Sequence, residues 1–236
     1  MTQSQAELSE FRFGPVVAPT LKEKIAGQIR KAILTGDLRP GARIVESKLA
    51  KQMGVAQTTV REAIQELEST GLVVKHVNRE TRVRQLTLGE IEQLFHLRLN
   101  LEGLAVELAH PNVDEKSLCS LYRIVAEMRG AAHHNDIADF YHFDVEFHRK
   151  LWSLSKHQFL VAALNPLMVG PVAFMLNGAP SRLASNYLKV ADEHSEIVDV
   201  LGNGTAEVAR RMMESKLRHW HEMQLNNIIN APERDS

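Results

Sequence analysis

The sequence predicts a mainly α-helical protein with two parts: three short helices followed by a β-hairpin, and then an all-helical bundle. Three observations support this prediction. Before residue 87, apolar residues recur at helical spacing in three short segments. Two runs that alternate and are rich in β-branched residues follow those segments. After residue 87 the strand signals vanish, and every segment has a helical pattern.

Residues 1–19 have little periodicity and contain two prolines, so we expect a flexible N-terminal arm. The first helix follows and stops at Gly36, ahead of the pair Pro40-Gly41. Its apolar residues recur at helical spacing: Leu21, Ile25, Ile29, Ile33 and Leu34.

A second short helix, ESKLAKQMG, is predicted to end at Gly54. A tight turn over 55–57 leads to a third helix, which begins near Thr58 and ends at Gly71. The runs LVVKH and TRVRQL then form a hairpin, in which Asn78 tolerates a positive φ. This order is the plan of a winged helix-turn-helix domain, and we assign it to residues 20–86.

Residues 87–236 are predicted to form an all-helical domain. Thr87 and Glu90 make a capping box that opens a long helix to about His110. Asp114 opens a second helix to about Gly130, and Asn135 or Asp136 opens a third that runs through Lys156. Further helices are expected near 158–176, 181–202 and 204–229.

The charges divide between the two parts. The whole chain has a net charge of −1, but residues 20–86 hold 13 Lys and Arg against 7 Asp and Glu, whereas residues 87–236 hold 14 against 20. A basic first part indicates that this part faces a polyanion. The sequence shows no signal peptide and no apolar run of membrane-spanning length. With a single cysteine, Cys119, expected to be buried, a cytoplasmic protein is predicted.

The third helix has the composition of a DNA-reading helix. Its N-terminal end carries Gln57, Thr58, Thr59 and Arg61, where donors can reach base edges and phosphates, while an apolar face packs inward. Arginines of the hairpin could reach the adjacent groove or backbone: Arg79, Arg82 and Arg84. The alternative is that these residues form only a solvated surface.

Asp144 and His148 are four residues apart on one predicted helix, so both project from the same face. Aromatic and aliphatic neighbours in HFDVEFHRKLW place them partly inside the bundle. A carboxylate and an imidazole on one face begin a metal site, although such a pair also forms a plain hydrogen bond.

Two stretches of the chain resemble a known family. The run LAKQMGVAQTTVREAIQELESTGLVVKHVNRETRV resembles the DNA-binding segment of the GntR family of bacterial regulators. The segments LRLNLEGLAVELA, DVEFH and DEHSEIVDVL resemble the FCD effector domain of its FadR subgroup. The resemblance covers the chain from about residue 20. It implies a homodimer that binds a pseudo-palindromic operator in double-stranded DNA and responds to a small molecule.

The DNA-binding segment departs from the family at several positions. Ser47 stands where the family usually has a basic residue, Gln57 stands where it usually has arginine, and Thr59 stands where it often has proline. Arg61 is the family arginine that is retained. Asn78 takes the place of the glycine in the wing turn. The contacts expected with DNA therefore involve Ser47, Asn78, Arg79 and Arg82 beside the residues of the third helix.

The resemblance also implies a metal site, because many FCD domains hold a divalent metal with one Asp and three His. Asp144, His148 and His194 match three of these ligands, but the fourth position falls on Lys216. A protonated ammonium cannot ligate a metal. Either the three ligands bind Zn²⁺, Ni²⁺ or Mn²⁺, or Lys216 pairs with Asp144 and takes the cation's place. His219 could substitute after a register shift, and His221 is expected at the surface.

Arg98 matches an arginine of the family that often faces the cavity, where a guanidinium suits a carboxylate. The alternative is a pair with Glu102, four residues later. We therefore predict a repressor, not an enzyme, released from its operator by an organic acid bound near Arg98 and Lys216. A metal-dependent hydrolase built on the helical bundle is the alternative function.

Overall fold

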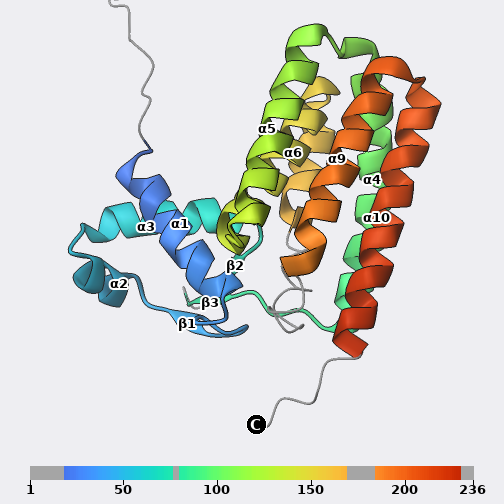
Figure 1. Ribbon diagram of the computed structural model, residues 1–236. Coiled ribbons are helices and arrows are strands. Elements are labelled where there is room, and N and C mark those ends of the chain that lie inside the picture. Colours follow the sequence, from blue (N-terminus) through green and yellow to red (C-terminus); the bar gives the residue numbers. More distant parts are fainter. Residues whose placement is uncertain (1–18, 77–79, 169–183, 230–236) are drawn as a thin grey trace, which may run out of the picture.

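The computed structural model describes residues 19–76, 80–168 and 184–229. Its elements form two lobes (Figure 1). One lobe contains three helices and a small sheet, and the other is a bundle of long helices that run side by side. This is the mainly helical architecture that the sequence predicts, and the expected N-terminal arm lies outside the described residues.

Three helices build the first lobe: α1 (Leu21–Leu34), α2 (Glu46–Met53) and α3 (Gln57–Ser69). A capping box between Thr20 and Glu23 begins α1. The chain turns between α2 and α3 at Gly54, which has the left-handed backbone conformation, with φ of 66°. A buried face of α3 packs against α1 and α2. That face consists of Val60, Ala63, Ile64 and Leu67.

The sheet has one strand more than predicted. The expected hairpin is present as β2 (Val73–Lys75) and β3 (Thr81–Val83), which pair in antiparallel register. A further strand, β1 (Arg43–Ile44), pairs with the other edge of β3, so the order is β1-β3-β2. The predicted hairpin is therefore confirmed, and β1 is an additional strand that the sequence did not reveal. A two-residue strand is too short to show alternation, and its partner lies far along the chain.

Caps define the helices of the second lobe. Thr87 and Glu90 form the predicted capping box of α4 (Leu88–Ala109). Asp114 caps α5 (Glu115–His133), and Asp136 caps α6 (Ile137–Leu154). A 3-10 turn, η1 (His110–Asn112), joins α4 to α5. These starts agree with the prediction, whereas α5 runs about one turn beyond the expected end.

The remaining helices are α7 (Gln158–Leu164), the 3-10 turn η2 (Asn165–Met168), α9 (Ala184–Asn203) and α10 (Ala206–Ile229). The helix expected over 158–176 is α-helical only to Leu164, because Pro166 follows closely and the chain tightens into η2. Residues 169–183 lie outside the described part of the chain. None of the described helices is long and apolar enough to cross a membrane.

The core of the bundle forms where α6 packs against α4 and α5. Its largest fully buried side chains include Trp152, Phe147 and Tyr141, all from α6. Cys119 on α5 is exposed, so the expectation that it packs inside was wrong. Its position on the outward side of α5 explains this, because the buried face of that helix is made by residues such as Leu121 and Val125.

The two lobes meet where α6 contacts α1. Lys31 of α1 pairs with Asp136, the cap of α6, at 3.6 Å. On its other side α1 is linked to α3, because Arg30 donates a hydrogen bond to Glu66 at 3.3 Å. Helix α6 therefore contacts the helix that supports α3.

The turn at Gly54 generates a test of this fold. Replacing Gly54 with Ala should lower the free energy of unfolding by roughly 1 to 2 kcal/mol, because a Cβ disfavours the left-handed conformation. No heavy atom lies within 4 Å of the position that a Cβ would take at Gly54, so the cost is conformational. Gly54→Asn should lose less, since Asn tolerates this conformation.

Gly27 in α1 is the matched control, because its Cβ position is equally open and its backbone is helical. Gly27→Ala should stabilise the protein by roughly 0.5 to 1 kcal/mol. Urea unfolding of the three variants measures both effects. A Gly54→Ala variant as stable as the wild type would contradict the assigned turn.

Candidate functional site

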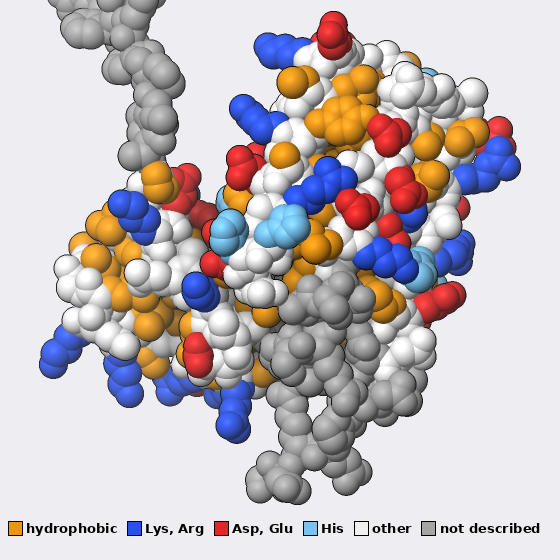
Figure 2. Space-filling view, viewed as in Figure 1, with side chains coloured by type: hydrophobic (Ala, Val, Ile, Leu, Met, Phe, Trp, Pro, Cys, Tyr) orange, Lys and Arg blue, Asp and Glu red, His pale blue; other side chains and the backbone are white. Residues whose placement is uncertain are grey.

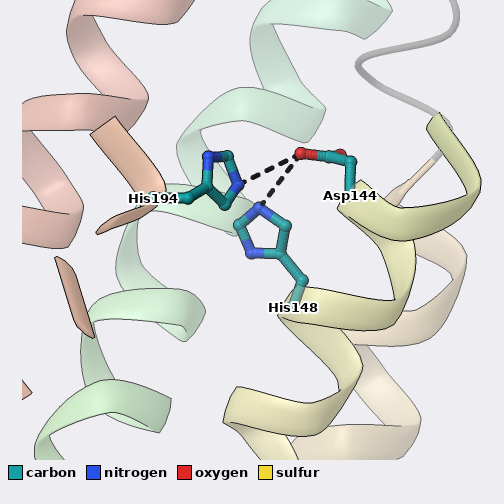
Figure 3. Close-up of side chains that lie close together, drawn as sticks. All are labelled: Asp144, His148 and His194. Carbon is teal, nitrogen blue, oxygen red and sulfur yellow. Dashed lines mark ion pairs between the residues drawn. The ribbon is translucent and has the colours of Figure 1, made fainter. Parts of the chain in front are cut away.

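Three predicted ligands meet inside the bundle. Asp144 and His148 come from α6 and His194 from α9, and their side chains point toward one another (Figure 3). The Asp144 Oδ1 atom lies 3.1 Å from His194 Nε2 and 3.9 Å from His148 Nε2. All three residues are buried. Within the described part of the chain, they are the group whose ligand atoms are close enough to share a metal ion.

The hydrogen bond of His194 determines which nitrogen faces the cluster with a lone pair. His194 Nδ1 lies 2.7 Å from the Val190 carbonyl oxygen. Because a carbonyl only accepts, Nδ1 must carry the proton and donate it. In the neutral ring, Nε2 is then unprotonated and faces Asp144. Metal-bound histidines are typically oriented in this way.

The Nε2 atom of His194 also lacks an aligned hydrogen-bond partner, although it is buried and close to Asp144. Burial lowers the pKa of His194, but Asp144 raises it more strongly, so the pKa is above its usual value. The Asp144 carboxylate would thus stabilise a proton on His194 Nε2, and the same carboxylate would be a ligand if a metal ion took the place of that proton. Metal bonds of about 2.0–2.2 Å place neighbouring ligand atoms roughly 3 Å apart. The distances from Asp144 Oδ1 to the Nε2 atoms of His194 and His148, 3.1 Å and 3.9 Å, are close to this value. The residues therefore fit a divalent cation.

Glu102 of α4 belongs to this site, although its sequence pattern did not reveal it. It is completely buried, and its Oε2 lies 2.6 Å from His148 Nδ1, off the direction of an aligned hydrogen bond. Its Oε1 accepts a hydrogen bond from Arg98 Nε at 2.6 Å, and Trp152 Nε1 donates to Oε2 at 3.3 Å. Burial raises the pKa of Glu102, but Arg98 and His148 lower it to about 2. Glu102 is therefore a buried anion.

Arg98 and Lys216, the predicted effector-binding residues, have internal partners. Arg98 is buried and forms the pair with Glu102 that was the alternative predicted from the sequence. Lys216 Nζ pairs with Glu196 at 2.5 Å, so the alternative in which Lys216 pairs with Asp144 was wrong. The lysine pairs with a residue of α9 instead of one of α6.

Two further histidines of α10 lie apart from the cluster. The exposed ring of His219 is 3.0 Å from Lys189 Nζ and 3.7 Å from Glu193. His221 was expected at the surface, but it is buried. Its ring stacks on Phe95 with centroids 3.8 Å apart, and its Nε2 lies 3.1 Å from Glu92. The packing of α10 on α4, which local spacing does not reveal, causes this burial.

Some of the predicted DNA-reading residues line a hollow of about 510 Å³ between α2, α3 and the sheet. Ser47, Gln57 and Arg61 line it. Gln57 and Arg61 both donate hydrogen bonds to Glu46 of α2, which lines the hollow as well. Thr58 is exposed and Thr59 is half-buried at the same end of α3. In Figure 2, Lys and Arg side chains gather along the lower left edge of the molecule, below α2 and the sheet.

The arginines of the hairpin contact the protein itself. Arg82 Nη1 donates to the Gly41 carbonyl at 2.8 Å, and its Nε pairs with Glu80. Arg84 Nε donates to the Gly71 carbonyl at 2.9 Å. Asn78 and Arg79 lie outside the described residues.

Two family models match the chain, one for each lobe. The model for bacterial regulatory proteins of the gntR family matches residues 21–83, and the model of the FCD domain matches residues 93–219. The second match alone spans more than half of the chain.

Named relatives are similar over most of their length. A probable D-xylose utilization operon transcriptional repressor of Paenarthrobacter nicotinovorans is 32% identical over 80% of this chain and 84% of its own. A gluconate operon transcriptional repressor of Bacillus licheniformis is 27% identical, over 85% and 82% respectively. The solved structure of Escherichia coli McbR/YncC superposes with a TM-score of 0.69 at 19% identity, covering 89% of this chain and 99% of that one, and so has the same fold.

Proposed function

Because this chain belongs to the GntR family of bacterial transcriptional regulators and carries an FCD domain, we propose that it is a homodimeric repressor controlled by a metal-dependent effector site. It is a DNA-binding regulator and not an enzyme, so the hydrolase alternative has no support. The observation that carries the proposal is the buried Asp144–His148–His194 cluster, two of whose members lie on α6, the helix that contacts the DNA-binding lobe. Since bacterial transcription is cytoplasmic, we propose that location.

In the proposed complex with DNA, α3 enters the major groove. Gln57, Thr58 and Arg61 stand at its N-terminal end, where side chains of a recognition helix meet base edges. The free backbone N–H groups of that end favour phosphate as well. Ser47, Thr59 and the hairpin residues Asn78, Arg79 and Arg82 would complete the contact surface. Residues 20–86 would suffice for binding, and a dimer would read two half-sites of a pseudo-palindrome.

In the proposed effector site, Asp144, His148 and His194 hold Zn²⁺, Ni²⁺ or Mn²⁺. Such a bound cation would act as a Lewis acid toward the oxygens of an effector. Glu102 holds its charge 2.6 Å from His148 Nδ1, and the other ring nitrogen of His148, Nε2, would be the metal ligand. Arg98 neutralises Glu102 in turn, and so acts on the site through it.

An organic acid is the effector class that this site fits best, because its carboxylate could bind the cation directly. The relative that is named a gluconate operon repressor supports a small hydroxy acid. Arg98 and Lys216 would assist only by releasing Glu102 and Glu196, their present partners. Binding would change transcription only if the effector has different affinities for the DNA-competent and DNA-incompetent states.

We further propose that the second lobe forms the dimer. Leucines on one face of α4 recur at spacings of four and three residues: Leu97, Leu101, Leu104 and Leu108. Leu97 is 53% exposed and Leu104 is 37% exposed. A second copy of the chain would bury this apolar stripe, at a gain of about 25 cal/mol for each Å² removed from water.

The DNA contact is tested with Arg61→Ala, which should weaken binding to a selected operator by roughly 1–3 kcal/mol if the side chain reads a base. Fluorescence anisotropy at fixed salt measures this, since salt sets the affinity scale. The side chain is half exposed, so the variant should retain the stability of the wild type to within about 1 kcal/mol. Unchanged operator affinity would contradict the assignment of Arg61.

The dimer is tested with Leu104→Glu, which places a charge in the stripe and should give a monomer in light scattering at micromolar concentration. Leu188→Glu is the matched control, because Leu188 on α9 is equally exposed but lies outside the stripe. It should leave the dimer intact. A dimeric Leu104→Glu variant would remove this face from the interface.

The metal site is tested by titrating Zn²⁺, Ni²⁺ and Mn²⁺ into chelator-treated protein. The wild type should bind one ion per chain and gain thermal stability. Replacing a residue that supports a ligand without touching the metal typically lowers metal affinity roughly 10- to 100-fold. His148→Ala removes a proposed ligand itself, so its affinity should fall by more than this. His142→Ala is the control, since His142 lies on the same helix but outside the cluster.

Lys216→His should tighten metal binding, because a neutral imidazole replaces a cation at the position where the resemblance to FCD domains implies a fourth ligand. Elemental analysis of the untagged wild type gives the occupancy as purified. A wild type with no thermal shift on adding metal, or a site that survives His148→Ala, would refute the proposed ligand set.

A further inference from the structure

Glu46, the first residue of α2, contacts both side chains that are expected to read bases. Its Oε2 accepts hydrogen bonds from Arg61 Nε at 3.1 Å and from Gln57 Nε2 at 3.3 Å. Arg61 Nη2 lies 3.0 Å from the same oxygen. One carboxylate oxygen of α2 therefore holds two side chains of α3 at the exposed end of that helix.

This carboxylate is charged and more protected than its partners. The Glu46 side chain is 18% exposed, against 50% for Arg61. Partial burial raises the pKa of Glu46, but the hydrogen bonds from Arg61 and Gln57 lower it by more. The pKa of Glu46 is therefore below its usual value. An anion on a surface that binds DNA repels the phosphates and lowers the affinity. Glu46 is therefore expected to have another role at this surface.

The geometry of the guanidinium indicates that role. Arg61 uses its Nε–Nη2 edge for Glu46, which leaves the Nη1–Nη2 edge with two parallel N–H groups. Two parallel donors match the O6 and N7 acceptors of guanine in the major groove. An arginine without such support can turn toward the nearest phosphate, which carries no sequence information.

We propose that Glu46 determines sequence specificity by holding Arg61 in the orientation for bidentate recognition of guanine. The same oxygen ties one amide N–H of Gln57, whose remaining N–H and carbonyl oxygen can still pair with adenine. Glu46 thereby reduces affinity for any phosphate and raises selectivity for one sequence. The inference rests on the proposed DNA-reading role of Arg61.

Glu80 is a matched control within the same hollow. It lines the hollow together with Glu46, but it contacts arginines of the sheet, Arg43 and Arg82, at 3.0 Å each. Glu80→Gln therefore removes the same charge from the same surface and leaves the Glu46–Arg61 contact in place. It also frees Arg82, but a contact of Arg82 with the DNA backbone carries no sequence information, so the affinities for all duplexes should change alike. Glu46→Asp is the second variant, because it keeps the charge and shortens the reach toward Arg61.

The experiment measures the affinities of full-length wild type and variants for two duplexes at one salt concentration. One duplex is an operator selected from random sequences by the wild type, and the other is a scrambled duplex of equal length. Glu46→Gln should bind the scrambled duplex more tightly and lower the ratio of the two affinities about tenfold. Glu46→Asp should lower the ratio without tighter binding to the scrambled duplex, and Glu80→Gln should leave the ratio unchanged.

A double variant separates the contributions. If Glu46 acts through Arg61, adding Glu46→Gln to Arg61→Ala should leave the affinity ratio of Arg61→Ala unchanged. Equal effects of Glu46→Gln and Glu80→Gln, or a further loss in the double variant, would overturn the inference. If Arg61→Ala weakens operator binding but Glu46→Gln and Glu46→Asp keep the wild-type ratio, the inference alone fails. If Arg61→Ala has no effect, the proposed contact of Arg61 fails first.

Discussion

A buried carboxylate, that of Glu102, constrains the arrangement of the effector lobe. An ion removed from water is tolerated only with charged partners and hydrogen bonds, and losing one such partner typically costs about 3–5 kcal/mol. Here Arg98 from the same helix, and His148 and Trp152 from α6, supply those partners. Their positions fix α4 against α6 and present His148 to Asp144 and His194. The candidate metal cluster and the helix packing thus both depend on one buried charge.

Helix α6 connects this site to the DNA-binding lobe. It carries Asp144 and His148, and its first turns contact α1, which in turn packs on α3. Because a packed helix moves as a unit, a change at the cluster can alter the placement of α1 without a separate relay. A carboxylate also restrains side chains at the other end of this path, where Glu46 holds Arg61 and Gln57. Both proposed sites therefore depend on an acid that positions the residues in contact with the ligand.

Much of this architecture could be predicted because its signals are local. Capping boxes at Thr87 and the cap at Asp114 marked helix starts, and the spacing of Asp144 and His148 placed both on one face. What could not be predicted depends on contacts between distant segments. The strand β1 exists through its pairing with β3, and His221 is buried through its stacking on Phe95 of another helix. The roles of Glu102 and Glu46 were likewise hidden, since an acid in a helical pattern is normally a solvated residue.

Control of the repressor depends, in this proposal, on a divalent cation held by one carboxylate oxygen of Asp144 and by imidazole nitrogens of His148 and His194. X-ray absorption spectroscopy at the zinc edge, on protein loaded with one equivalent of Zn²⁺, measures the type and distance of the atoms bound to the zinc ion. We expect two imidazole ligands at about 2.0–2.1 Å together with oxygen ligands. The imidazole signal should fall in His148→Ala and stay unchanged in His142→Ala. A zinc site without imidazole ligands, or an imidazole signal that is unchanged in His148→Ala, would contradict the proposed ligand set.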